Sequence, residues 1–230
     1  MTRRTAATTT VGIIGTSCRR GHDMDQMTET LFSKMLERCR QILADRVLPL
    51  CGRLPLLISG GSACSDHLAV VLWLERPESF AGLRLYLPCA WSRSDGRFVD
   101  GRGPGRTLNS LHRLFSARFG RYSLGDLSRA LALCAEFVTT ASGFHARNEQ
   151  VARHSRHLVA FSWSGHGRVK DSVPVDEGTL DTWSRCTGFK VHVPLALIDC
   201  RIARAMVPSA LRFGAPYGRV ESETSSGRHG

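Results

Sequence analysis

The chain has 230 residues, which is enough for one large domain or two small ones and long enough to bury a full hydrophobic core. Its hydrophobic content of 42% and charged content of 22% are ordinary for a globular protein. Because no apolar run approaches the roughly 20 residues of a membrane span, we expect neither a transmembrane helix nor a membrane partner.

Eight cysteines are scattered along the chain, and no two of them form a C-x-x-C pair. Scattered thiols favour a reducing compartment, so the cytoplasm is the expected location, with the nucleus or an organelle left open. His154 and His157 lie close in sequence, but a zinc site needs more convergent ligands than these two. We therefore expect no disulfide framework, no metal and no cofactor.

Short apolar runs alternate with segments of helical periodicity. Residues 11–15 form an apolar run ending in glycine, and residues 24–47 then carry apolar positions at helical spacing. The expected strands are 11–15, 54–58, 83–87, 158–162 and 190–194, and the expected helices are 24–47, 65–74, 108–119, 124–138, 147–153 and 178–186. This alternation predicts an α/β fold, a Rossmann-like open parallel sheet with helices on both faces.

The domain organisation follows from where this alternation stops. Residues 11–213 are expected to form a single domain, with residues 92–122 as an arginine-rich insert whose first part, 92–106, lacks any clear period. Residues 1–10 are expected to be a flexible tail, and the Gly- and Ser-rich residues 214–230 a disordered one.

The formal net charge of +11 is the strongest compositional signal, and it is unevenly distributed. Residues 84–121 hold eight arginines against two aspartates. Such a segment can steer nucleic acid to the surface, attract a phosphorylated small molecule, or form a solvated loop. Charge alone leaves these three interpretations open.

Several short motifs fall at the junctions between strands and helices. Ser59-Gly60-Gly61 follows an expected strand, Arg147-Asn148 opens a helix, Gly178-Thr179 starts another, and Gly15-Thr16 ends the first strand. In an open α/β sheet such junctions line one crevice at the carboxyl ends of the strands, where small residues let backbone N–H groups approach a phosphate. Each motif also has a structural explanation, such as a tight turn for the glycine pair or a threonine cap.

The order and spacing of these motifs resemble the SLOG superfamily, the Rossmann-like group that contains the DNA-processing SMF proteins and the lonely-guy-type nucleotide phosphoribohydrolases. The resemblance rests on residues 12–15, 59–66 with Ala69, 144–148 with 157–161, and 178–183. It extends over most of residues 11–195 and implies a nucleotide-like ligand.

The resemblance also implies a role for each matching residue. Gly60 and Gly61 would cradle a phosphate or ribose, and Asp66 would face the ligand or cap the next helix. Arg147 would contact a phosphate with its planar donor fork, and Asn148 would bind ribose or order the loop. Gly178 and Thr179 would hold a second phosphate at a helix N-terminus.

The chain departs from the family pattern at the last motif. Asp176-Glu177 precedes Gly178, and an acid there repels a phosphate unless its side chain turns away or holds a ribose hydroxyl. Thr182 stands where the phosphoribohydrolases carry their catalytic glutamate, and Asp181 lies one residue earlier, about 100° round a regular helix. These departures favour binding over hydrolysis.

The sequence therefore predicts a domain that binds a nucleotide or a nucleotide derivative resembling ADP-ribose and acts as a sensor. One alternative is an N-glycosidase of the nucleoside 5′-monophosphate phosphoribohydrolase type, with Asp181, Glu177 and Asp66 as candidate catalytic carboxylates. A second alternative is nucleic-acid binding through the basic segment. A homodimer is left open.

Overall fold

The computed structural model describes residues 9–19, 21–51, 53–99, 103–140, 143–163 and 172–199. Residues 1–8 of the expected N-terminal tail and all of the expected C-terminal tail lie outside these ranges, whereas Thr9 is buried and Thr10 begins the first strand. The tails are therefore not tested, but the folded part starts two residues earlier than the sequence predicts.

A six-stranded sheet forms the centre of the molecule, and every neighbouring pair of its strands is parallel. The strands in spatial order are β6 (Glu136–Thr139), β3 (Gly82–Leu87), β2 (Leu56–Ser59), β1 (Thr10–Gly15), β7 (His157–Ser162) and β8 (Phe189–Pro194). A short antiparallel hairpin of β4 (Trp91–Ser92) and β5 (Arg97–Phe98) lies beside it. The predicted open parallel α/β sheet is confirmed.

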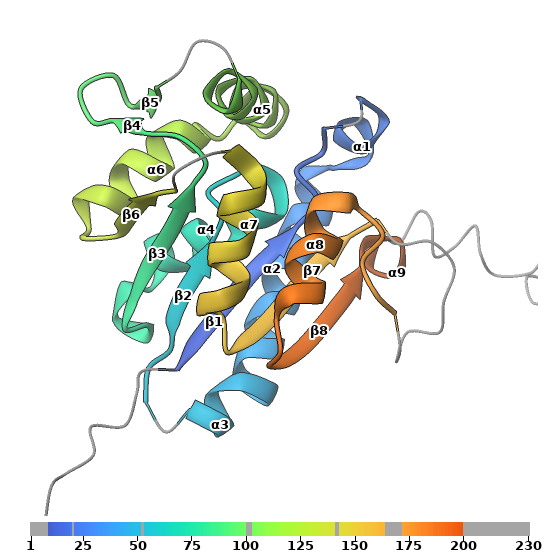
Figure 1. Ribbon diagram of the computed structural model, residues 1–230. Coiled ribbons are helices and arrows are strands. Elements are labelled where there is room, and N and C mark those ends of the chain that lie inside the picture. The colour runs from blue at the N-terminus through green and yellow to red at the C-terminus, as the bar shows by residue number, and fades with distance from the viewer. Residues whose placement is uncertain are drawn as a thin grey trace, which may run out of the picture.

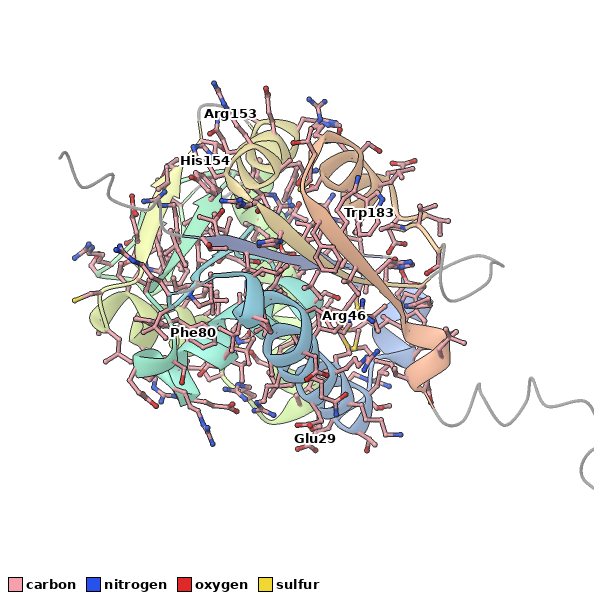
Figure 2. The ribbon with its side chains drawn as sticks, turned by 90° about the horizontal axis from the view of Figure 1, so that it is seen from below. Glu29, Arg46, Phe80, Arg153, His154 and Trp183 are labelled. Carbon is pink, nitrogen blue, oxygen red and sulfur yellow. The ribbon has the colours of Figure 1, made fainter. Side chains whose placement is uncertain are left out.

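Helices cover both faces of the sheet. Figure 1 shows α7 (Gly143–His154) and α8 (Glu177–Arg185) in front of the strands, and α2 (Glu29–Ile42) and α4 (His67–Glu75) behind them. The view from below separates the same two layers, with His154 and Trp183 on one side and Glu29 on the other (Figure 2). The remaining helices are α1 (Gly21–Gln26), the π-helix Leu43–Val47, α3 (Leu48–Cys51), the 3-10 turns Cys64–Asp66 and Pro77–Ser79, α5 (Pro104–Phe119), α6 (Ser123–Ala132) and α9 (Leu195–Ile198).

Each face of the sheet has its own hydrophobic core, because successive strand residues point to opposite sides. On β1, Val11 and Ile13 belong to the large core under α2 and α4, whereas Ile14 belongs to the smaller one under α7 and α8. On β7, Val159 and Leu158 divide in the same way. This two-sided burial explains why the strands are continuous apolar runs in the sequence.

Two predicted helices are wrong. The predicted helix 24–47 is divided, because Thr28 accepts a hydrogen bond from the Leu31 N–H at 3.2 Å and caps a new helix there. The predicted helix 124–138 ends at Ala132, and Cys134 then adopts a φ of 63°, which an α-helix does not allow. The chain turns there into the edge strand β6, which pairs with β3.

The segment 92–106, expected to be one loop, contains ordered elements in its described part. It completes the β4–β5 hairpin, and α5 begins at Pro104, a residue well suited to the first turn of a helix. Phe98 is buried there against Trp91, with ring centroids 5.0 Å apart. The aromatic residues of this hairpin therefore serve packing.

Candidate functional site

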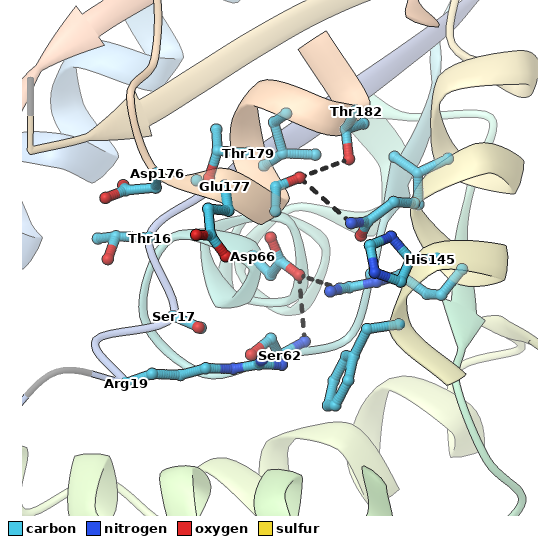
Figure 3. A pocket seen from close by; sticks show the side chains of 18 of the residues that line it. Thr16, Ser17, Arg19, Ser62, Asp66, His145, Asp176, Glu177, Thr179 and Thr182 are labelled. Carbon is cyan, nitrogen blue, oxygen red and sulfur yellow. Dashed lines mark hydrogen bonds and ion pairs between the residues drawn. The ribbon is translucent and has the colours of Figure 1, made fainter. Parts of the chain in front are cut away.

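A pocket opens at the carboxyl ends of the strands, where the strand order reverses. The chain passes from β1 through β2 and β3 to β6 on one side, and then returns to β7 on the other side of β1. Ligands of open α/β sheets bind at this kind of reversal. The cavity measures about 290 Å³ and is lined by the ends of β1 and β2 and by the first turns of α7 and α8 (Figure 3).

The floor of the pocket is an ion pair between Asp66 and Arg147. The Arg147 guanidinium donates to Asp66 Oδ2 at 2.8 Å, and the backbone N–H of Ser62 donates to the same oxygen at 3.3 Å. Both side chains are largely buried, with 6% of Asp66 and 11% of Arg147 exposed. Burial raises the pKa of Asp66, and the charge of Arg147 opposes that rise.

Gly60 makes this ion pair possible. A Cβ atom at position 60 would lie 1.7 Å from Arg147 Nη1 and 2.7 Å from Asp66 Oδ2. Only a residue without a side chain lets the guanidinium lie against the backbone here. The glycine is therefore needed for the approach of Arg147.

A second arginine lies in the same part of the pocket. Arg19, which follows β1, places its guanidinium carbon 3.9 Å from the centroid of the Phe144 ring, and that of Arg147 lies 5.6 Å from the same centroid. Burial, and then the charge of Arg147, lower the pKa of Arg19. Two guanidinium groups thus share one aromatic ring, and that of Arg147 is paired with Asp66.

The first turn of α8 forms the opposite wall. Glu177, Gly178 and Thr179 line the pocket, and Asp176 at the N-cap position makes no side-chain capping bond. Figure 3 shows the Glu177 carboxylate directed into the pocket and the Asp176 carboxylate directed away from it. The start of helix α8 and the Glu177 carboxylate therefore line the pocket together.

Asn148 connects the two helices that flank the pocket. Its side-chain amide donates to the Gly178 carbonyl at 3.2 Å and to Asp181 Oδ2 at 3.4 Å. Thr182 donates to the same Gly178 carbonyl at 3.1 Å. Asn148 therefore orders the start of α8, one of the two roles that the sequence left open.

Most of the residues predicted for the site line this one pocket: Gly15, Thr16, Gly60, Asp66, Arg147, Asn148, Glu177, Gly178 and Thr179. Ser59, Gly61 and Asp181 do not line it. Ser59 is fully buried and its hydroxyl donates to the Ile13 carbonyl at 2.7 Å. Asp181 instead accepts from Arg185 at 2.7 Å, and this neighbour lowers the pKa of its carboxyl group against the effect of burial.

Gly61 has a structural role that a buried histidine completes. Its φ of 67° lies in the left-handed region, and its carbonyl accepts a hydrogen bond from His112 Nε2 at 3.1 Å. The other ring nitrogen of His112 lies 3.0 Å from Ser123 Oγ. Burial lowers the pKa of His112 to about 3, so the ring is neutral near neutral pH. The tight turn, the alternative explanation for the glycine pair, applies at this residue.

The sequence assigned no ligand role to several residues of the pocket, among them Ser62, Arg19 and Phe144, although Ser62 and Phe144 lie within motifs that carry the resemblance. Ser62 is 2% exposed, and its Oγ has no hydrogen-bond partner among the described residues. The positions of the other two could have indicated the site. Arg19 follows closely on β1, and Phe144 lies three residues before Arg147, on the same side of a helix. Trp183 does not line this pocket but a separate groove beside β8.

The arginine-rich segment is partly neutralised in the fold. Arg84, Arg97, Arg118 and Arg121 each form an ion pair with a carboxylate. Arg121 is held 2.6 Å from Asp126, which also contacts the buried His67 at 3.1 Å. Four of the eight arginines of this segment therefore have a carboxylate partner.

The described residues contain no helix long and apolar enough to cross a membrane. They also contain no group of three or more His, Cys, Asp or Glu residues placed to hold a metal ion. His154 instead stacks on Tyr86, with ring centroids 5.1 Å apart.

Fold and pocket together place the chain among the Rossmann-like α/β proteins with a polar pocket at the reversal of strand order. No protein-family model matches the chain. It is 33% identical over 175 residues to "Uncharacterized protein R261" of Acanthamoeba polyphaga mimivirus, covering 76% of this chain and 89% of the viral protein. The chain belongs to the same protein family as this viral protein.

Proposed function

We propose that the protein binds a nucleotide or a nucleotide derivative in the pocket between β1, β2, α7 and α8, and acts as a sensor or carrier of that ligand. One observation carries the proposal: two arginines, an aromatic ring and the first turn of a helix converge at the reversal of strand order. Guanidinium groups bind phosphate, the aromatic ring holds the two of them beside each other, and the N–H groups at a helix start can donate to a sugar or a base.

The pocket dimensions and the motifs support this proposal. A volume of about 290 Å³ lies near the lower end of the range for small-molecule pockets, roughly 300–1,000 Å³. We extend the proposal to membership of the SLOG superfamily, because each motif that carries the resemblance contributes residues to one pocket. Of the three predicted residues outside the pocket, Ser59 and Gly61 hold the adjacent turn in place, and Asp181 is paired with Arg185.

A thermal-shift screen tests the proposed function. The purified full chain is heated with nucleoside mono-, di- and triphosphates, NAD, ADP-ribose and cyclic nucleotides, because a ligand that binds only the folded state raises its melting temperature. We expect at least one of these compounds to raise it in a concentration-dependent manner. No shift with any of them at millimolar concentration would refute nucleotide binding.

A second candidate function is cleavage of the N-glycosidic bond of a nucleotide. The direction of Glu177 favours it, since cleavage through an oxocarbenium-like transition state needs a carboxylate near the anomeric carbon. Asp181 is directed to Arg185 and Asp66 is engaged by Arg147, so Glu177 is the remaining candidate for this role. Chromatography of each ligand after incubation distinguishes the functions, because only an enzyme releases free base.

A further inference from the structure

The charges of the pocket are divided between its two ends. Arg19 and Arg147 lie at one end, beside Phe144, where Asp66 is paired with Arg147 and Asp23 also lines the pocket. Glu177 occupies the other end, at the start of α8. A ligand with one anionic end and one neutral, hydroxyl-bearing end matches this division.

The arginine end also holds unused hydrogen-bonding capacity. Among the described residues, neither Arg147 Nε nor Ser62 Oγ has a hydrogen-bond partner, although both atoms are buried. Ser62 is 2% exposed and lines the pocket. Buried polar groups without partners are rare, and a bound phosphoryl group would supply acceptor oxygens for these donors.

The helix end is poorly suited to phosphate. A helix N-terminus carries roughly half a positive charge, which one full carboxylate charge outweighs. Glu177 supplies such a charge at the first position of α8 and points into the pocket. A carboxylate is, however, a strong acceptor for the hydroxyl groups of a sugar.

From this arrangement we infer that Arg19 and Arg147 hold the single phosphoryl group of the ligand beside Phe144, and that Glu177 faces the sugar and excludes phosphate from the start of α8. The inference rests on the proposed function and adds an orientation to it. Arg19 and Glu177 then determine specificity: the first selects for a phosphoryl group, and the second selects for sugar hydroxyls and against further phosphates.

Isothermal titration calorimetry of the full chain tests the role of Arg19, with AMP, ADP, ATP and adenosine as probes. The wild type is expected to bind AMP more tightly than ADP or ATP. Arg19→Gln is expected to weaken AMP binding by about tenfold or more while changing adenosine binding little, since a charge-assisted hydrogen bond is lost. Arg153→Gln is the matched control, because Arg153 is exposed on α7 and does not line the pocket.

Glu177→Gln tests the other end with the same probes and 2′,3′-dideoxy-AMP. The wild type is expected to prefer AMP over the dideoxy analogue by about tenfold, as hydrogen bonds to a charged group would give. The variant is expected to lose most of that preference and to bind ADP and ATP more tightly. Glu149→Gln, at an exposed position on α7 outside the pocket, is expected to change none of these affinities.

The outcomes separate the inference from the proposed function. A wild type that binds nucleotides but whose affinities are unchanged by Arg19→Gln, or unchanged by Glu177→Gln, refutes the orientation and leaves nucleotide binding intact. Tighter binding of ATP than of AMP by the wild type refutes it equally. A wild type that binds none of the probes refutes both.

Discussion

Adding a single methyl group at Gly60 should disrupt the floor of the pocket. In Gly60→Ala the new Cβ would lie 1.7 Å from Arg147 Nη1 and 2.7 Å from Asp66 Oδ2, far inside van der Waals contact. The guanidinium must therefore leave its position 2.8 Å from the Asp66 carboxylate. The guanidinium is the end of a flexible side chain and can shift toward the pocket, but this movement weakens its pairing with the buried Asp66 carboxylate.

The expected cost follows from the burial of this pair. Removing one partner of a buried ion pair destabilises a protein by roughly 3–5 kcal/mol. Here both partners remain and the adjoining pocket admits water, so we expect a loss of about 2 kcal/mol in the free energy of unfolding. For a domain of this size, that corresponds to a fall of about 4–8 °C in melting temperature.

Gly178→Ala is the matched control, because Gly178 lines the same pocket but has room for a side chain. A Cβ atom there would meet Asn148 Nδ2 at 3.7 Å, an ordinary contact, and alanine is the better helix former. Differential scanning calorimetry should give Gly178→Ala a melting temperature equal to or above that of the wild type. If Gly60→Ala melts with the wild type as well, Arg147 is not held against Gly60 and the geometry of the site is wrong.

Three further predictions concern individual side chains. Burial lowers the pKa of His112 from 6.5 to about 3, so the contribution of the neutral ring to stability is complete above pH 6.5 and is lost as the pH falls toward 3. Urea unfolding between pH 4.5 and 7.5 should show a decline in the free energy of unfolding toward low pH, and His112→Asn should reduce that decline. A decline that His112→Asn leaves unchanged would assign it to other groups. Asp181→Asn should change ligand affinity by less than about twofold, because this carboxylate is held by Arg185 outside the pocket, and a tenfold loss in calorimetry would contradict that placement. If the protein releases free base from a nucleotide, Glu177→Gln should abolish the release and Asp181→Asn should not; the reverse result, read by chromatography, would return the catalytic role to Asp181.

The elements that the sequence predicts well are those in which local pattern and tertiary packing agree. The central strands are continuous apolar runs because both faces are covered, and five of them were placed within two residues of their observed bounds. The sixth strand, β6, was missed because Phe137 and Val138 continue the apolar spacing of α6. The break is made by the backbone at Cys134, and a positive φ at a cysteine has no sequence signal.

The candidate site was predictable as a location but not as a set of contacts. Strand ends fix where Gly15, Gly60, Arg147 and Gly178 lie, because parallel strands present their carboxyl ends at one edge. Which neighbouring glycine faces the pocket depends on φ at Gly61 and on the approach of Arg147 to Gly60, and both are tertiary facts. Arg19 was missed because nothing in its sequence neighbourhood shows that Phe144 lies beside it.

The position of the carboxylates on α8 connects the structure to the question of catalysis. Thr182, which the proposed resemblance aligns with the glutamate of the phosphoribohydrolases, lines the pocket, and its hydroxyl donates to the Gly178 carbonyl. If that alignment holds, the pocket lacks the catalytic carboxylate at this position, and Asp181, which does not line the pocket, does not supply it. Glu177, the first residue of the same helix, places a carboxylate in the pocket instead. At the helix N-terminus its negative charge opposes phosphate binding. If the chain is an enzyme, we therefore expect its substrate to lie with the phosphoryl group toward Arg19 and the sugar toward Glu177. If it is a binding protein, the same two residues would select for that orientation of the ligand.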